Sequence, residues 1–319
     1  EMAFCDWSSD VCSSDLNITC AAPISLASVF DGDTRQLKSF YIPSVPKIIP
    51  AILTGLLDNE AESNPFKDWN IVFIPYCTGD LHIGNTTNSY NKDGKQFEIR
   101  HNGRNNSQEA LQWVFDNFKN PGKVVVSGES AGAYGSAFWA PSLAGYYESK
   151  KIYQLSDGSL LASNRWKEIL DTVWKAESLS YLKFEIGNDI FEDALLQQPD
   201  SLNDRIKHLH SNTVYDAVLT KFSAALNHTP ISTNQFIDDW STNMRASMKR
   251  LADSKLDYQY FLSDCKYDSK NHSTPHTLTG IDYYNCGVDQ ISFSEWLKKN
   301  IIDDDSLSVG NMLVVPVNK

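Results

Sequence analysis

The sequence predicts an α/β protein built on a mostly parallel sheet with helices on both faces. Residues Trp69–Tyr76 form a near-continuous apolar run, which is typical of a strand buried on both faces. Two more short apolar runs, Lys123–Ser127 and Lys151–Leu155, lie on either side of a segment rich in small residues that begins at Ala131. Asp257–Ser263 has the pattern of a late strand. Strands that alternate with helices in this way favour a parallel sheet with crossover helices.

The remaining segments predict where the helices lie. Apolar residues in 47–57 fit one helical face, and Asn106 with Glu109 has the spacing of a helix cap. Ser292 with Glu295 forms a capping box before a closing helix. Residues 166–255 are mainly helical in pattern, so we expect a helical insertion there, and the polar segment 78–91 is expected to be a loop.

The first sixteen residues, EMAFCDWSSDVCSSDL, differ from the rest of the chain. They have no apolar core segment, no regular period and no signal-peptide cleavage site, and WSSDVCSSDL resembles a translated sequencing adapter. A disordered polar tail is the alternative interpretation. Under both, residues 1–16 lie outside the core and residues 17–319 form a single domain, from which upstream strands of the sheet are expected to be missing.

Composition excludes several classes of function. The formal net charge of −12 over 319 residues, with no basic patch, argues against a nucleic-acid partner. No run of about 18 uncharged apolar residues is present, so no membrane span is expected. The six cysteines form no CxxC pair and no metal-ligand spacing, so no metal site is predicted. Cys265 and Cys286 could form a disulfide around the loop between them, or be two reduced core thiols.

The most informative motif is Gly128-Glu129-Ser130-Ala131-Gly132, a G-x-S-x-G pentapeptide. It follows the Val124–Val126 strand and precedes a helix start made of small residues. In an α/β-hydrolase this strained strand-to-helix turn exposes a nucleophilic serine hydroxyl at the sheet edge. Ser130 is therefore the candidate nucleophile; a Gly-rich turn with a structural serine is the alternative.

Chain order restricts the other members of a catalytic triad. The order Ser, acid, His requires a histidine beyond the last strand, which leaves His272 and His276. Asp157, directly after the strand 151–155, and Asp216 are both possible acids, and order alone ranks Asp216 only slightly higher.

Several segments together resemble the pectin acetylesterase family, which includes the Notum carboxylesterases. They are NPFKDWNIVFIPYCTGDLHIGN (64–85), ALQWVFDNF (110–118), VVVSGESAGAYGSAF (124–138), LSDGS (155–159) and HTLTG (276–280). The likeness extends from about Cys20 to the closing helix and is greatest to bacterial members. It implies an α/β-hydrolase fold and a secreted or cell-envelope enzyme that needs no cofactor and hydrolyses small acyl esters on polysaccharides.

The resemblance also assigns roles to residues. It implies Ser130 as the nucleophile, His276 as the base and Asp216 as the acid, which leaves Asp157 a structural or substrate-facing residue. The expected partner is an acetylated polysaccharide or a small ester, and the oligomeric state is left open. A Notum-like lipid or acyl-protein esterase, a peptidase and a non-catalytic carbohydrate-binding relative are the alternatives.

The chain departs from the family pattern at one point. Members carry a Gly-rich loop that supplies half of the oxyanion hole, and residues 1–16 occupy its place here. The N–H of Ala131 is the remaining expected donor. Because the loss of one such donor costs on the order of 10²–10³ in rate, weak activity is expected for the chain as written.

Overall fold

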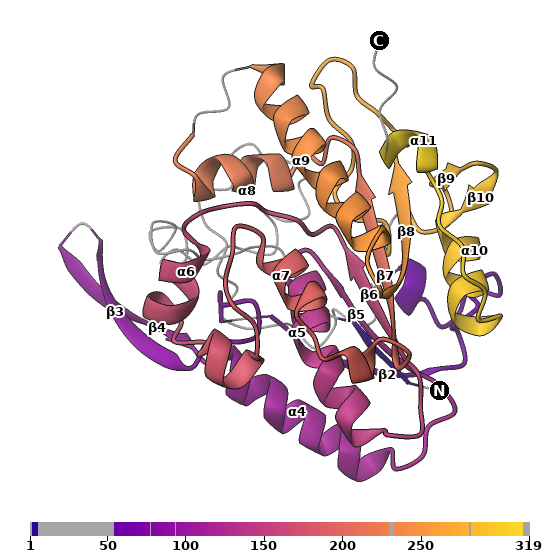
Figure 1. The fold of residues 1–319 in the computed structure, drawn as a ribbon, viewed down its shortest axis with the longest axis horizontal. Helices are drawn as coiled ribbons and strands as arrows, with labels where there is room; N and C mark the ends of the chain where they lie inside the picture. Colours follow the sequence, from indigo (N-terminus) through magenta and orange to yellow (C-terminus); the bar gives the residue numbers. More distant parts are fainter. Residues whose placement is uncertain are drawn as a thin grey trace.

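A parallel β-sheet forms the centre of the molecule (Figure 1). A computed structural model describes residues 2–5, 54–76, 78–92, 94–229, 233–280 and 282–314. Six strands lie in the order β2-β1-β5-β6-β7-β8, and each neighbouring pair is parallel. Their bounds are β1 Met2–Cys5, β2 Asn70–Phe73, β5 Val124–Glu129, β6 Ile152–Asp157, β7 Ile206–Thr213 and β8 Asp257–Ser263.

Alternate residues of these strands face two different cores. Val124, Val126 and Ile152 contribute to one buried cluster, whereas Val125 and Tyr153 contribute to the other. Because successive side chains of a strand point to opposite faces, both faces of the sheet are covered. The predicted fold class, an α/β-hydrolase-like parallel sheet with helices on both faces, is confirmed.

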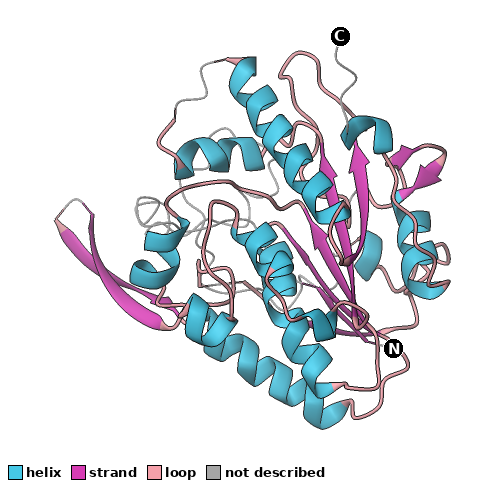
Figure 2. Ribbon diagram, viewed as in Figure 1, coloured by secondary structure: helices cyan, strands magenta, loops and turns pink. Residues whose placement is uncertain are grey.

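The larger layer of helices covers the first of these faces (Figure 2). It contains α4 Gly103–Asn117, α5 Ala131–Tyr146, α6 Trp166–Glu168, α7 Ile190–Leu196, α8 Leu219–Leu226, α9 Asn234–Ala252 and α11 Asn311–Val314. The opposite face carries the short helices η2 Gly55–Leu57, α10 Phe293–Leu297 and η6 Lys298–Ile302. Ser292 caps α10 by accepting a hydrogen bond from the N–H of Glu295 at 3.2 Å, as the capping-box pattern predicts.

Short helices also fill the crossover between β6 and β7. After α6 come η3 Ile169–Val173, η4 Ser178–Leu182, α7 and η5 Asp200–Leu202. Trp166 and Trp174 are fully buried in this segment and pack with their rings 6.3 Å apart. A helical insertion is therefore present, although the strand β7 lies inside the range that was expected to be mainly helical.

Three sequence-based boundaries are wrong. The segment expected to be a loop contains β3 Thr86–Lys92, which pairs antiparallel with β4 Lys95–His101 in a projecting hairpin (Figure 1). Helix α4 begins at Gly103, before the expected cap at Asn106, because the Asp80 carboxylate accepts a hydrogen bond from the Gly103 N–H at 2.7 Å. The strand β7 was missed because its sequence, IKHLHSNT, is largely polar even though all eight residues are buried.

The N-terminal segment also differs from expectation. Residues 1–16 were expected to lie outside the core, but Met2–Cys5 form β1, between β2 and β5. A parallel strand in this position supplies backbone hydrogen-bond partners to both neighbours. The rest of residues 1–16, the expected helical face in 48–53, Cys20 and Cys77 lie outside the described residues.

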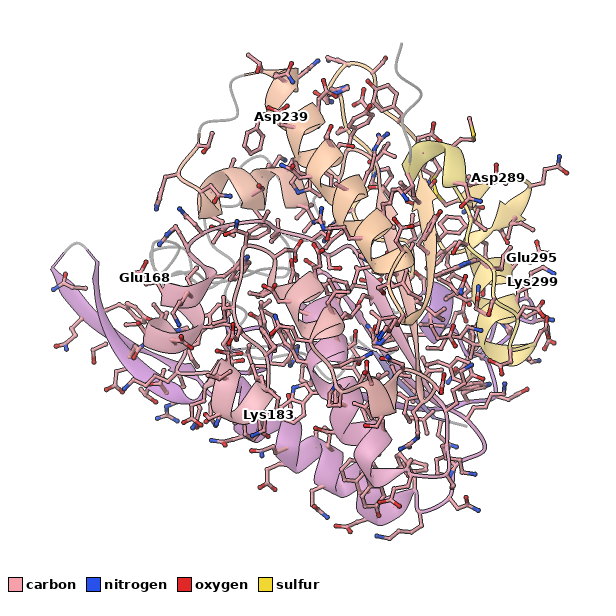
Figure 3. All side chains as sticks on the ribbon, viewed as in Figure 1. Glu168, Lys183, Asp239, Asp289, Glu295 and Lys299 are labelled. Atoms are coloured by element: carbon pink, nitrogen blue, oxygen red, sulfur yellow. A yellow bond between two sulfur atoms is a disulfide. The ribbon has the colours of Figure 1, made fainter. Side chains whose placement is uncertain are left out.

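Charged side chains are concentrated on the periphery of the molecule (Figure 3). Glu168, Lys183, Asp239 and Glu295 are examples of exposed charges on or beside the outer helices. In the part of the chain that the structure describes, no helix has the length and apolar character needed to cross a membrane.

Candidate active site

Ser130 occupies a strained turn between β5 and α5. Its φ of 54° and ψ of −116° are unusual for a residue with a side chain. A Cβ on Gly128 would lie 2.0 Å from the carbonyl oxygen of Gly132, so the turn can close only with glycine there. The Ser130 N–H donates to the Asp157 carbonyl at 2.8 Å, which ties the turn to the end of β6. This is the strand-turn-helix context that the pentapeptide predicts.

Ala131 is the first residue of α5. Because Ala131 begins the helix, its N–H has no acceptor within the helix and lies at the positive end of the helix dipole. Such a group is suited to stabilising an oxyanion formed at the Ser130 side chain.

The structure brings His276 and Asp216 together. His276 Nδ1 donates to Asp216 Oδ2 at 2.7 Å, and the aspartate is fully buried just beyond β7. The second oxygen, Oδ1, accepts from the N–H groups of Val218 and Leu219, both at 2.8 Å. These contacts fix the carboxylate, so it can orient the imidazole and hold a proton on Nδ1.

The environment of His276 favours its protonated form. Burial lowers the pKa of the imidazole, but the charge of Asp216 and its hydrogen bond raise it, and Asp157 and Glu129 raise it further. The net effect is a pKa above the ordinary value of 6.5. The other ring nitrogen, Nε2, is buried and has no hydrogen-bond partner among the described residues. It is therefore available to accept a proton from a reacting group.

Gly158 connects the histidine with the serine turn. A Cβ on Gly158 would lie 3.0 Å from His276 Cε1, so the imidazole packs directly against this glycine. The preceding residue, Asp157, receives the Ser130 N–H. The ends of β5, β6 and β7 thus bring Ser130, His276 and Asp216 to one edge of the sheet.

Asp157, the other candidate acid, has different partners. Its Oδ1 accepts from the Ser211 hydroxyl at 2.6 Å. Its Oδ2 accepts from the backbone N–H groups of Leu278 and Thr279 at 2.5 and 2.7 Å. The carboxylate of Asp157 therefore contacts the loop that follows His276, whereas Asp216 contacts the imidazole.

His272, the other candidate histidine, lies in a separate cluster. Its Nδ1 is 2.6 Å from the hydroxyl of Tyr267, and its Nε2 is 2.8 Å from a carboxylate oxygen of Asp238 on α9. Both ring nitrogens are occupied, which leaves His276 as the histidine with a nitrogen available for catalysis.

Two residues of the site were not singled out from the sequence. Glu129, the variable position of the pentapeptide, is 8% exposed and accepts a hydrogen bond from the hydroxyl of Thr279. Glu129 and Thr279 both lie in motifs that carry the family resemblance, but a variable motif position gives no signal of its own.

Among the described residues, no group of three or more His, Cys, Asp or Glu side chains is arranged to hold a metal ion.

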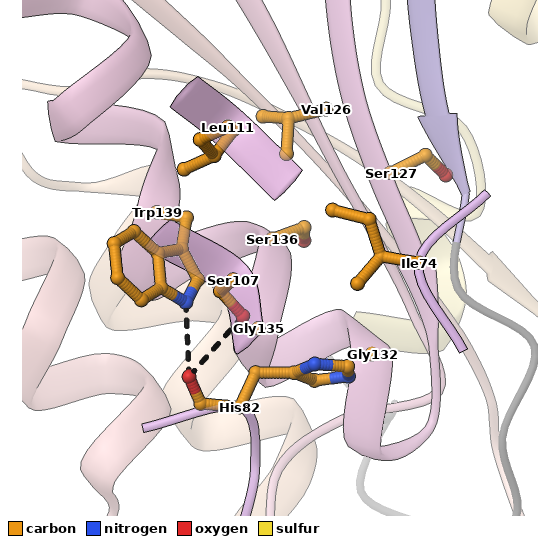
Figure 4. A pocket seen from close by; sticks show the side chains of 10 residues that line it. All are labelled: Ile74, His82, Ser107, Leu111, Val126, Ser127, Gly132, Gly135, Ser136 and Trp139. Carbon is orange, nitrogen blue, oxygen red and sulfur yellow. Dashed lines mark hydrogen bonds between the residues drawn. The ribbon is translucent and has the colours of Figure 1, made fainter. Parts of the chain in front are cut away.

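The segment 78–85 packs beside the start of α5 and closes a small cavity (Figure 4). The Asp80 carboxylate accepts from the Thr78 hydroxyl at 2.5 Å and from the His82 N–H at 3.1 Å. The indole of Trp139 donates to the His82 carbonyl at 3.1 Å. The cavity, of about 40 Å³, is lined by Ile74, His82, Ser107, Leu111, Val126, Ser127, Gly132, Gly135, Ser136 and Trp139. These contacts give a structural reason for the specific sequence of this segment.

The disulfide left open by the sequence is present. Cys265 and Cys286 are bonded, with their Cα atoms 5.7 Å apart and 21 positions apart in the sequence. The bridge encloses the segment that carries His276.

Comparison with known protein families gives one match. The pectinacetylesterase family model matches residues 44–175, a range that includes the segment 78–85 and the Ser130 turn. Asp216 and His276 lie beyond the matched range. A search of curated proteins found no match. The matched segment, together with the parallel sheet flanked by helices, makes this chain similar to the pectin acetylesterase family, whose members are carboxylic ester hydrolases of the α/β-hydrolase fold.

Proposed function

We propose that this protein is a serine carboxylesterase that removes acetyl groups from pectin or another acetylated polysaccharide. One arrangement carries the proposal: a serine with positive φ on a strand-to-helix turn and a buried His-Asp pair occur at the same carboxyl edge of a parallel sheet. The family match supports ester hydrolysis, and the choice of an acetylated polysaccharide follows the family description.

In the proposed mechanism, Ser130 attacks the ester carbonyl carbon while His276 Nε2 accepts the hydroxyl proton. Asp216 keeps the other ring proton on Nδ1 and stabilises the imidazolium. The Ala131 N–H stabilises the oxyanion of the tetrahedral intermediate. The bond from the acyl carbon to the sugar oxygen then breaks as His276 protonates that oxygen, which releases the sugar hydroxyl and leaves an acyl-enzyme on Ser130. Water, deprotonated by His276, attacks this ester and releases acetate.

We also propose that the protein acts outside the cytoplasm. The disulfide supports this, because such bonds persist mainly in oxidising compartments. Labelling of the protein by a thiol reagent after purification without reductant would contradict it if both Cys265 and Cys286 reacted.

The first experiment measures acetate release from acetylated pectin and hydrolysis of short nitrophenyl esters. Ser130→Ala should abolish both activities. Ser149→Ala is the matched control, because Ser149 is exposed just beyond the opposite end of the same helix, α5. Activity that survives in Ser130→Ala would remove Ser130 from the mechanism.

Two further measurements separate the alternatives. A preference for acyl chains of about eight or more carbons would favour a Notum-like lipid esterase over an acetylesterase. A serine-directed fluorophosphonate should label the wild-type protein at Ser130. If the folded protein neither reacts with this probe nor hydrolyses any ester, the non-catalytic carbohydrate-binding alternative is correct.

A further inference from the structure

A row of buried polar side chains lies at the carboxyl ends of the three central strands. Glu129 on β5, Asp157 on β6 and Ser211 on β7 are register partners. Side chains in register on neighbouring parallel strands point to the same face of a sheet. Their exposed fractions are 8%, 0% and 0%, so the row is closed to solvent by what covers it.

The loop that follows His276 covers this row. Thr279 donates its hydroxyl to Glu129, and the same oxygen is 3.0 Å from Asp157 Oδ2. The N–H groups of Leu278 and Thr279 both point at Asp157 Oδ2. Asp157 therefore accepts hydrogen bonds from the second and third residues after the histidine.

The residues before His276 are held separately. The hydroxyl of Thr213, at the end of β7, donates to the Pro275 carbonyl at 2.6 Å. Thr274 forms a β-bridge with Asp216. His276 thus lies between two attachment points of the loop, one at the end of β7 and one on Asp157.

Asp157 is well suited to this task, because both of its oxygens accept hydrogen bonds in a buried site. Burial raises the pKa of its carboxyl group, and the hydrogen bonds from Ser211, Leu278 and Thr279 act in the opposite direction. Two buried backbone N–H groups would be left without their acceptor if the side chain were removed, which is costly in a site closed to water.

We propose that Asp157 is a positioning residue of the esterase, which fixes the backbone of Leu278 and Thr279 and thereby the place of His276 beside Ser130. The inference rests on the proposed function. Asp157 accepts hydrogen bonds from the backbone of the loop, whereas Asp216 contacts the imidazole itself.

Two substitutions distinguish hydrogen bonding from charge. In Asp157→Asn the amide oxygen can still accept from Leu278 and Thr279, and the amide NH₂ can donate to Ser211, but the charge is lost. In Asp157→Ala all of these bonds are lost. Because a displacement of about 1 Å at a catalytic group can cost on the order of 100-fold, Asp157→Ala should lower kcat on a short nitrophenyl ester by about that factor with little change in KM. Asp157→Asn should restore most of the wild-type kcat.

Asp189→Ala is the matched control. Asp189 also accepts from two backbone N–H groups, those of Phe191 and Glu192 at 3.1 and 3.3 Å, but it does so at the start of α7. This variant should lose thermal stability and keep the wild-type kcat.

The outcomes separate this inference from the proposed function. Wild-type protein that neither hydrolyses the ester nor reacts with fluorophosphonate would refute the proposed function. With an active wild type, a folded Asp157→Ala variant with unchanged kcat overturns the positioning role, and so does an Asp157→Asn variant as slow as Asp157→Ala. If Asp157→Ala does not fold, Asp157→Glu is measured in its place, because glutamate keeps the carboxylate but displaces it by one methylene. The kcat of Asp157→Glu should be lower than that of Asp157→Asn, and a higher kcat for Asp157→Glu overturns the inference.

Discussion

Gly158→Ala tests whether the position of His276 limits catalysis. Gly158 follows β6, has a φ of +72°, and is in contact with the imidazole. The substitution adds a single methyl group next to the proposed base and changes no group that takes part in the reaction. Its effect on the rate therefore reports on geometry.

The size of the effect follows from two contributions. A residue with a Cβ in the left-handed region costs about 1–2 kcal/mol relative to glycine. The new Cβ would also lie 3.0 Å from His276 Cε1 and 3.0 Å from Thr277 Cγ2. Since carbon atoms in contact prefer about 3.5–4.0 Å, the imidazole must move by roughly 0.5 Å. If a displacement of about 1 Å costs on the order of 100-fold in rate, half of it should cost about tenfold.

Gly94→Ala provides the control for backbone strain. Gly94 has a φ of +75°, almost the same as Gly158, but no atom lies within 4 Å of the position of its added Cβ. It lies in the turn between β3 and β4. Both variants should lose thermal stability through backbone strain, Gly158→Ala the more because of its added close contacts, and only Gly158→Ala should lose kcat on a short nitrophenyl ester.

Equal kcat values for the two glycine variants would refute this reasoning. If Gly158→Ala and Gly94→Ala have the same kcat, then either the imidazole tolerates the displacement or His276 is not the base. Ester hydrolysis by a His276→Ala variant would decide for the second explanation.

Four other predictions follow from the same structure. Asp216→Asn should lower kcat by about 10⁴-fold, because the amide no longer holds the ring proton on Nδ1, and a pH-rate profile should show the acidic limb at lower pH. Because the pKa of His276 is raised in the folded state, its protonation contributes fully to stability below pH 6.5, and this contribution is lost as pH rises through the folded-state pKa. Over the same interval kcat/KM should rise, because the reaction needs a neutral imidazole. Unfolding and rate measurements at matched pH values check both directions. Replacing Cys265 and Cys286 by serine should cost about 3 kcal/mol of unfolding free energy, measured by urea titration, and a reductant should have no further effect on that variant. Deleting residues 1–16 should destabilise the protein if β1 supports the sheet, and an unchanged melting temperature would show instead that β1 is dispensable.

The strands that the sequence predicts most accurately are those made mainly of apolar and aromatic residues, although β2 is an edge strand and only partly buried. WNIVFIPY contains β2 and DYQYFLS coincides with β8, because apolar and aromatic residues dominate both segments. β7 is buried along its whole length but was missed. Its two histidines lie inside the sheet, where His208 bonds to Gln154 at 2.9 Å and His210 to Tyr258 at 2.7 Å. Polar residues that satisfy one another across strands cannot be distinguished from exposed residues without knowing which strands are neighbours.

The β3–β4 hairpin was missed for a different reason. Its residues are mostly polar and exposed, so hydrophobic periodicity carries no signal there. The hairpin is held by particular contacts, such as the bond from the Asn88 side chain to the Val173 carbonyl at 2.6 Å. Contacts between residues so far apart in sequence depend on the tertiary fold.

The two candidate acids show where sequence reasoning about the site ends. Asp157 is the last residue of the buried strand β6, Asp216 follows the neighbouring buried strand β7, and both aspartates are fully buried. Chain order brings each to the edge where His276 lies, so order gives little ground to choose between them. What differs is the direction from which the histidine loop approaches. The bridge between Thr274 and Asp216 holds the residues before His276 beside the segment that follows β7, while Leu278 donates its N–H to Asp157 at the end of β6. Asp216 therefore faces the ring and Asp157 faces the backbone two residues later, so one loop gives two equivalent aspartates different roles.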